Sequence, residues 1–161
     1  MRQVLLHKGF DEHDRKGIVA LLREYEAGIG ISLCFQGFDA ELAGLPGEYA
    51  PPGGTMLLAR EAAGGGLLGC VALRAVREVP GLCEMKRLYV RPAGRGTGLG
   101  RKLALAAIVE AERLGYTRMC LDTLPTMTAA QNLYRALGFR QSGMSETEPA
   151  VLLFERDLGT G

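Results

Sequence analysis

The segment from Arg91 to Arg101 has residue types and a spacing that suit the binding of a phosphate group. Its sequence, RPAGRGTGLGR, places alternating glycines between a strand-like run and a helical pattern. Glycines let the backbone approach a ligand closely, while the start of a helix presents unpaired N–H groups and the positive end of the helix dipole. The segment therefore predicts an anion site, most naturally for phosphate. A tight turn without a ligand is the alternative.

Two well-known phosphate loops are excluded by spacing. The pattern G-x-x-x-x-G-K-[ST] of nucleotide triphosphatases is not met in any register. The dinucleotide pattern G-x-G-x-x-G fails because Arg101 stands where the third glycine is required. A P-loop enzyme and a Rossmann dehydrogenase are both disfavoured.

The pattern Arg95-x-x-Gly98-x-Gly100, placed after LYVRP, resembles the acyl-CoA signature of the GNAT superfamily of N-acetyltransferases. Further along, RMCLDTLPTMTAAQNLYRALGF is similar to the next strand and helix of that superfamily and ends in its L-Y-x-x-x-G-F pattern. That pattern falls on Leu133, Tyr134, Gly138 and Phe139. Two signatures in the same order are more specific than either alone.

The resemblance is strong over residues 83–139, consistent in topology over residues 55–79, and weak before that. It implies one N-acetyltransferase domain over residues 1–161, with an acyl-CoA core at about residues 55–140 and an acceptor-side region at residues 1–54. A chain of 161 residues has the size of one domain. The expected fold class is α/β (α+β), with a mixed, mainly antiparallel central sheet flanked by helices and a β-α-β cofactor-binding core.

The resemblance also implies which residues hold acetyl-CoA. Amides of the glycine-rich segment would bind the pyrophosphate, and the preceding strand would pair through its backbone with the pantetheine arm as with an added strand. These cofactor-binding residues are Leu88, Tyr89, Val90, Arg95, Gly96, Thr97, Gly98, Leu99, Gly100 and Arg101. No metal is expected, because the chain has only two histidines and none lies at metal-ligand spacing from a cysteine.

Acetyl transfer to an amine requires a base, and Glu84 is the leading candidate because it matches a catalytic glutamate of some superfamily members. If the strand is regular, Glu84 shares a face with Lys86, so a charge pair or a substrate anchor is the alternative role. Rival acids in the N-terminal half are Glu24, Asp39 and Glu41.

Tyr134 matches the residue that supplies a proton or hydrogen bond to the departing CoA thiolate, although a tyrosine at this helical spacing also suits a core. Direct transfer needs no covalent intermediate, and Cys83 is a weak candidate for a nucleophile, because neither histidine is in the motif region. Met127 stands where many members have an asparagine that touches the cofactor, so that contact is not carried over. Asp122 and Thr123 are expected to line the cleft instead.

The elements that must position these residues can be identified from periodicity. Residues 14–27 predict an amphipathic helix, and residues 28–54 an ordered, partly helical loop. Three strand-like runs, TMLLAR, GLLGCVALRAV and LCEMKRLYV, predict an antiparallel meander. After the glycine-rich turn come a helix at 99–114, a strand at 118–123, a helix at 127–137 and a strand at 151–156.

Composition limits the partners. Lys and Arg number 19 against 18 Asp and Glu, which argues against a nucleic-acid surface or a polybasic membrane patch. The first residues show neither a signal peptide nor a membrane span, and the four separated cysteines suit reduced thiols, so a cytoplasmic protein is expected. The apolar content of 47% leaves surface for a homodimer.

The leading hypothesis is an N-acetyltransferase that uses acetyl-CoA and an amine of a small molecule, a peptide or a protein lysine. The alternatives are a non-catalytic CoA-binding or regulatory module of the same fold, and a plain interaction domain. The acids of the N-terminal half, together with Glu84, favour a cationic acceptor.

Overall fold

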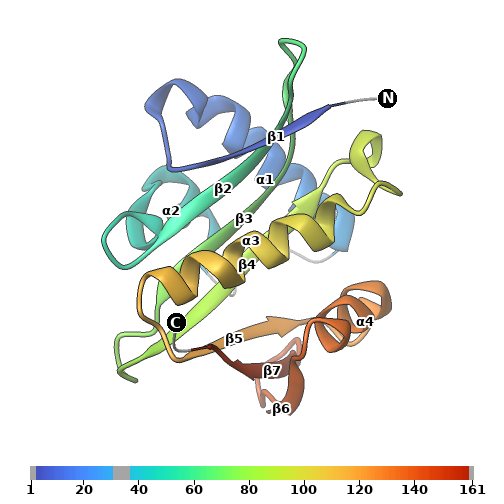
Figure 1. Cartoon of the computed structure of the whole chain (residues 1–161). Helices are drawn as coiled ribbons and strands as arrows, with labels where there is room; N and C mark the ends of the chain where they lie inside the picture. Colours follow the sequence, from blue (N-terminus) through green and yellow to red (C-terminus); the bar gives the residue numbers. More distant parts are fainter. Residues whose placement is uncertain (1–2, 31–36, 160–161) are drawn as a thin grey trace.

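The structure, a computed structural model, describes residues 3–30 and 37–159, which form one seven-stranded sheet with helices on both faces (Figure 1). The strands are β1 (Val4–Lys8), β2 (Thr55–Glu61), β3 (Leu67–Ala75), β4 (Leu82–Val90), β5 (Arg118–Thr123), β6 (Arg140–Met144) and β7 (Leu152–Asp157). The helices are α1 (Arg15–Ile29), α2 (Phe38–Ala43), α3 (Leu99–Arg113) and α4 (Thr128–Ala136). The expected α/β class with a mixed sheet is confirmed.

The sheet has the order β1-β2-β3-β4-β5-β7-β6. Strands β2, β3 and β4 pair antiparallel with their chain neighbours, which confirms the predicted meander. Strand β5 then pairs parallel to β4, and α3 supplies the crossover between them. This β4-α3-β5 unit is the predicted β-α-β core.

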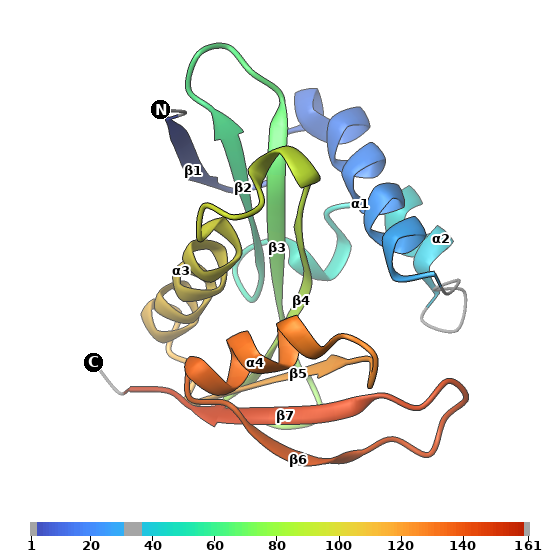
Figure 2. The same ribbon diagram turned by 90° about the vertical axis from the view of Figure 1, so that its right-hand side faces the viewer.

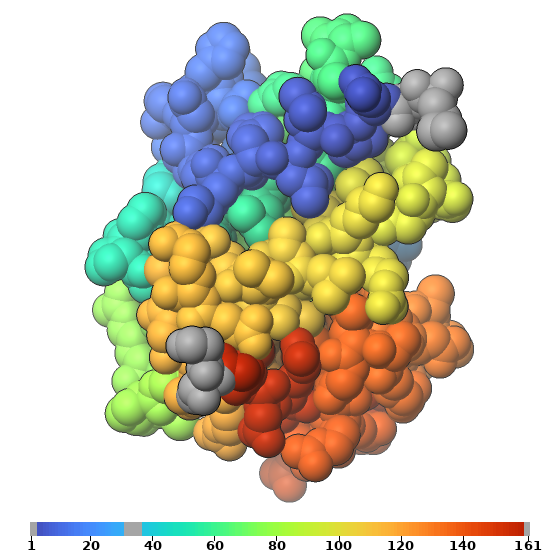
Figure 3. All heavy atoms as spheres, viewed as in Figure 1, coloured from blue at the N-terminus to red at the C-terminus, as the bar shows by residue number. Residues whose placement is uncertain are grey.

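Helices lie on both faces of the sheet (Figure 2), and each face has its own core of buried apolar side chains. Helix α3 places its apolar residues at helical spacing, including Leu103, Ala107 and Ala111, against one face of the sheet. Helices α1 and α2 bury Ile18, Leu22 and other apolar side chains against the opposite face. In the space-filling view, α3 lies across its face between the N-terminal strand and the C-terminal segments (Figure 3).

Two strands have no counterpart in the sequence prediction. Strand β1 forms from a short apolar run because it pairs antiparallel with β2 at the edge of the sheet. Strand β6 has the sequence RQSGM, which lacks strand periodicity, and it forms by pairing with β7. The predicted irregular region contains α2 and a 3-10 turn at Gly47–Tyr49, while Cys34 and Phe35 lie outside the described residues.

Among the helices of the described residues, none combines the length and the apolar character needed to cross a bilayer.

Candidate functional site

A cleft opens where β4 and β5 separate. The two strands pair only from Leu82 with Arg118 to Glu84 with Cys120, after which β5 turns across the direction of β4 (Figure 2). The backbone of β4 beyond Glu84 therefore has no β5 partner, although β3 covers its other edge. An exposed edge of this kind can accept an extended ligand as an added strand.

A β-bulge lies in β4 at the mouth of this cleft. Cys70 of β3 pairs with Tyr89 and Ala72 with Lys86, so Val71 faces two residues of β4. Arg87 is one of these two, and its backbone has a φ of 60°, which a non-glycine residue seldom adopts. The extra residue bends β4 and changes the direction of the side chains that follow.

The glycine-rich segment ends at the start of α3 and has unpaired amides. The Arg95 amide donates to the Pro92 carbonyl at 3.2 Å, and the first bond of the helix runs from the Lys102 amide to the Gly98 carbonyl at 3.0 Å. Within the described residues, no backbone carbonyl accepts from the amides of residues 96–101. The Arg95 amide is already used, so the amides available to an anion begin at Gly96.

The glycines of this segment leave room for a ligand. Gly96 and Gly98 have φ values of 80° and 77°, where a side chain would be strained, and a Cβ at either position would meet no atom within 4 Å. Gly100 has no positive φ, and a Cβ there would make only an ordinary contact, 3.8 Å from Val90. The fold does not require glycine at Gly100, which fits close approach by a ligand.

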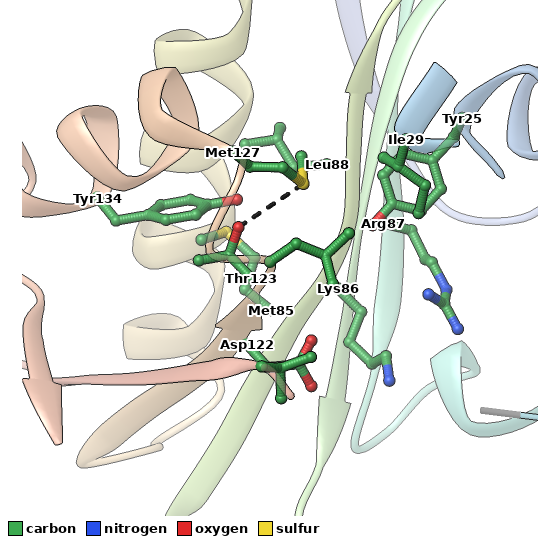
Figure 4. Close-up of a pocket in the computed structure, with 12 residues that line it drawn as sticks. Tyr25, Ile29, Met85, Lys86, Arg87, Leu88, Asp122, Thr123, Met127 and Tyr134 are labelled. Atoms are coloured by element: carbon green, nitrogen blue, oxygen red, sulfur yellow. Dashed lines mark hydrogen bonds between the residues drawn. The ribbon is translucent and has the colours of Figure 1, made fainter. Parts of the chain in front are cut away.

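Tyr134 reaches the cleft from α4 and is 8% exposed (Figure 4). Its ring packs against Phe139 and Phe154, with centroids 6.0 and 6.4 Å away. None of the described residues is hydrogen-bonded to its hydroxyl. Burial, with smaller contributions from Tyr25 and Asp122, raises the pKa of this phenol above its ordinary value of 10.0. The hydroxyl therefore stays protonated at neutral pH and can donate a hydrogen bond.

The L-Y-x-x-x-G-F pattern also has structural reasons. Gly138, with a φ of 93°, ends the turn after α4, and the Phe139 amide donates to the Tyr134 carbonyl at 3.0 Å. These backbone features end the helix just after Tyr134 and do not involve its hydroxyl.

Glu84 is buried and bonded to an arginine. Its carboxylate accepts from Arg74 at 2.7 Å (Nε) and 2.6 Å (Nη2), and Arg74 also contacts Glu48 at 2.8 Å. Glu84 is 8% exposed and is not among the residues that line the cleft. The structure therefore does not bring Glu84 and Tyr134 together in one cavity, and the role of Glu84 as the base stays a prediction.

Asp122 and Lys86 line the cleft from β5 and β4 (Figure 4). Burial, only partly opposed by Lys86, raises the pKa of the Asp122 carboxyl above its ordinary value of 3.8, and the charge of Glu84 adds to the rise. Asp122 and Thr123 are expected in the cleft from the sequence, and both line it. Lys86 lines it as well, although its spacing of two residues from Glu84 along the strand suggests only a charge pair with that residue.

The rival acids of the N-terminal half are ion-paired. Glu24 contacts Arg91 at 2.8 Å, Glu41 contacts Arg87 at 2.8 Å, and Asp39 contacts Arg23 at 2.9 Å. Arg87 lies in β4, Arg91 directly follows β4, and Arg23 lies in α1. Glu24 and Glu41 thereby fasten the N-terminal half to the sheet, Asp39 joins α2 to α1, and none of the three lines the cleft.

Cys83 is fully buried and faces the α3 core. Burial, with Cys120 adding to it, raises the pKa of this thiol to about 12, so it is not a thiolate at neutral pH. No histidine of the described residues lines the cleft. The arrangement does not favour a covalent cysteine mechanism.

Met127 lies at the start of α4 and lines the cleft, where its sulfur is 3.8 Å from the Thr123 hydroxyl. Asn132 is exposed and is not a lining residue, in agreement with its expected direction away from the site. A thioether thus occupies the position of the usual asparagine amide, and the loop before α4 is instead fixed by Gln131, whose amide donates to Leu124 and Pro125 carbonyls at 3.1 Å.

The chain is similar to known proteins over most of its length. The family model described as Acetyltransferase (GNAT) family matches residues 21–139. An uncharacterised N-acetyltransferase from Schizosaccharomyces pombe is 48% identical over 120 residues, which cover 74% of this chain and 72% of that protein. An uncharacterised N-acetyltransferase from Escherichia coli is 33% identical over 132 residues, covering 78% and 76% of the two chains.

The same architecture occurs in a crystal structure of a GNAT-family acetyltransferase from Staphylococcus aureus. It superimposes with a TM-score of 0.82 over 98% of this chain and 100% of that one, at 17% sequence identity. At this identity the likeness concerns the fold.

Proposed function

Because the chain belongs to the GNAT family of acetyltransferases and is an acyltransferase, we propose that it transfers an acetyl group from acetyl-CoA directly to an amine. The observation that carries this proposal is the position of Tyr134. Its hydroxyl reaches the cleft between β4 and β5, next to the strand edge that continues into the glycine-rich segment.

The described residues fit acetyl-CoA. The unpaired amides of residues 96–101 would hold the pyrophosphate, helped by the positive end of α3. The open edge of β4 at Leu88, Tyr89 and Val90 would hold the pantetheine arm by backbone hydrogen bonds. When bound, acetyl-CoA supplies an activated acetyl thioester and a thiolate leaving group.

The residues of the chain contribute mainly by positioning and by handling protons. Amides of the β4 edge would orient and polarise the thioester carbonyl for attack by the amine. Tyr134 holds a proton at its hydroxyl and donates it, or a hydrogen bond, to the departing sulfur. No group of the chain needs to be acylated, in accordance with the buried and protonated thiol of Cys83.

Two carboxylates are candidates for the base that receives the proton of the amine. Glu84 is the one that the resemblance implies, and its carboxylate is bonded to Arg74, so it would act through water. Asp122 lines the cleft directly, and its pKa is raised towards the range in which a carboxylate is an effective base. The geometry favours Asp122 for direct contact with the amine.

Calorimetric titration with acetyl-CoA tests the proposal first, followed by a search for acceptor-dependent release of thiol. We expect saturable binding and thiol release with at least one amine. Binding without any turnover would support the alternative of a CoA-binding module, and absence of binding would contradict the proposed use of the glycine-rich segment.

A further inference from the structure

The cleft crosses the sheet and has two ends with different chemistry (Figure 4). Tyr134 and Met127 reach it from α4. Met85 and Leu121 pack in the core under α3, so their strand neighbours Lys86 and Asp122 point to the opposite face. Because the thiolate leaves on the side of Tyr134, the amine acceptor must approach on the side of Lys86 and Asp122.

Acidic side chains on this acceptor face are mostly neutralised by arginines. The pairs are Glu24–Arg91, Glu41–Arg87, Asp39–Arg23, and Glu48 and Glu84 with Arg74. Their charges are engaged within the protein, so they offer little attraction to a cationic acceptor. The acidic composition of the N-terminal half is therefore a poor guide to the acceptor.

Lys86 and Asp122 differ from those pairs. Both are half-buried and line the cleft, and within the described residues neither forms an ion pair or a side-chain hydrogen bond. Partly desolvated charges are costly unless a partner compensates them. Lys86 and Asp122 attract each other across neighbouring strands but form no ion pair, so both can bind a ligand with the complementary charges.

We propose, on the basis of the acetyl transfer proposed above, that the acceptor is a small amine that also carries a carboxylate, such as a free amino acid. The Lys86 ammonium binds the acceptor carboxylate, and the Asp122 carboxylate receives the acceptor ammonium group. The ammonium group gives one proton to Asp122, and the neutral nitrogen forms the amide bond as the C–S bond breaks. The sulfur takes a proton from Tyr134, and the second proton lost by the nitrogen returns through solvent to the Tyr134 oxygen.

A panel of matched acceptors tests this assignment. Amino acids, their carboxamides and polyamines are compared by thiol release at saturating acetyl-CoA. We expect at least one amino acid to be used with a kcat/KM about tenfold or more above that of its carboxamide, the effect of one charge-assisted hydrogen bond. Preference for carboxamides or polyamines would overturn the assignment while leaving acetyl transfer intact.

Variants at Lys86 separate a role in binding from a role in folding. Lys86→Met should raise KM for the amino acid about tenfold or more and remove the preference for the amino acid over its carboxamide. Lys86→Arg should restore part of the affinity and of the preference. Lys16→Met, at an exposed position of α1, is the matched control. An unchanged preference in Lys86→Met would refute the role of this lysine.

Binding provides a readout independent of turnover. Calorimetric titration of the CoA-saturated protein with the preferred amino acid should give saturable heat in the wild type and weaker binding in Lys86→Met. If no member of the panel releases thiol, the carboxylate assignment falls, while acetyl transfer itself is decided by the wider search for acceptor-dependent release of thiol.

Discussion

Glu41 and Arg87, 46 residues apart in the chain, are joined by two hydrogen bonds, from Arg87 Nε at 2.9 Å and from Nη2 at 2.8 Å. The Arg87 guanidinium also lies over the ring of Phe38, with 4.9 Å to the centroid. The β-bulge turns this arginine towards α2, so the same irregularity that bends β4 at the cleft also anchors the acceptor-side region to it.

Loss of the Glu41 charge should destabilise the fold. Burial alone would raise the pKa of this carboxyl, but hydrogen bonds and charge from Arg87 outweigh it and lower the pKa below 4.5. The Glu41–Arg87 pair therefore contributes its full stabilisation above about pH 4.5, and this contribution is lost as the pH falls through the lowered pKa of Glu41. We expect Glu41→Gln to lower the free energy of unfolding by about 3 kcal/mol at pH 7 in urea titrations.

The pH dependence distinguishes the charge from packing. The difference between wild type and Glu41→Gln should narrow when the titration is repeated at about pH 4, where the unfolded state binds a proton at this site. Glu12→Gln, which removes an exposed pair with Arg15, should change stability little. An equal loss at both pH values would indicate packing instead.

Removal of the Tyr134 hydroxyl should slow the chemical step. Tyr134→Phe keeps the ring contacts with Phe139 and Phe154, so the fold and the dissociation constant of acetyl-CoA should change little. We expect kcat to fall about a hundredfold. Tyr116→Phe removes a hydroxyl that is bonded to the Gly53 carbonyl and does not line the cleft, so this variant should keep kcat. A similar fall in both variants would contradict the assignment.

A charge at Gly98 should abolish binding of the cofactor. Gly98→Glu places a carboxylate in open space beside the amides expected to hold the pyrophosphate. Gly115→Glu is a matched control, because Gly115 also has a positive φ and open space but follows the other end of α3. Calorimetry should show that Gly98→Glu weakens the binding of acetyl-CoA at least a hundredfold, a loss of binding free energy on the order of 3 kcal/mol. Gly115→Glu should bind acetyl-CoA as the wild type does. Equal binding of acetyl-CoA by both variants would indicate that the pyrophosphate binds elsewhere.

The acidic limb of the pH–rate profile should identify the base. A base acts when deprotonated, so the rate rises as pH increases through its pKa, which for Asp122 lies above 3.8 because of burial. We expect Asp122→Asn to lower kcat/KM and to flatten this rise. If Glu84→Gln flattens it and Asp122→Asn does not, the base is Glu84, as the sequence resemblance implies.

The sequence by itself determined the features whose causes are local. Helical periodicity identified α1, α3 and α4, and the glycines before Leu99 identified a helix start with unpaired amides. Strand patterns identified the meander and β5. These predictions succeeded because they depend on backbone preferences and side-chain spacing within a few residues.

Only the tertiary structure decided which charges remain available. The sequence cannot indicate that Glu41 meets Arg87 or that Glu84 meets Arg74, because those contacts join residues from separate elements. It cannot indicate the bulge at Arg87 either, since no glycine marks it. The separation of β4 from β5, which leaves Lys86 and Asp122 facing one cleft, arises from pairing between strands that lie far apart in the chain.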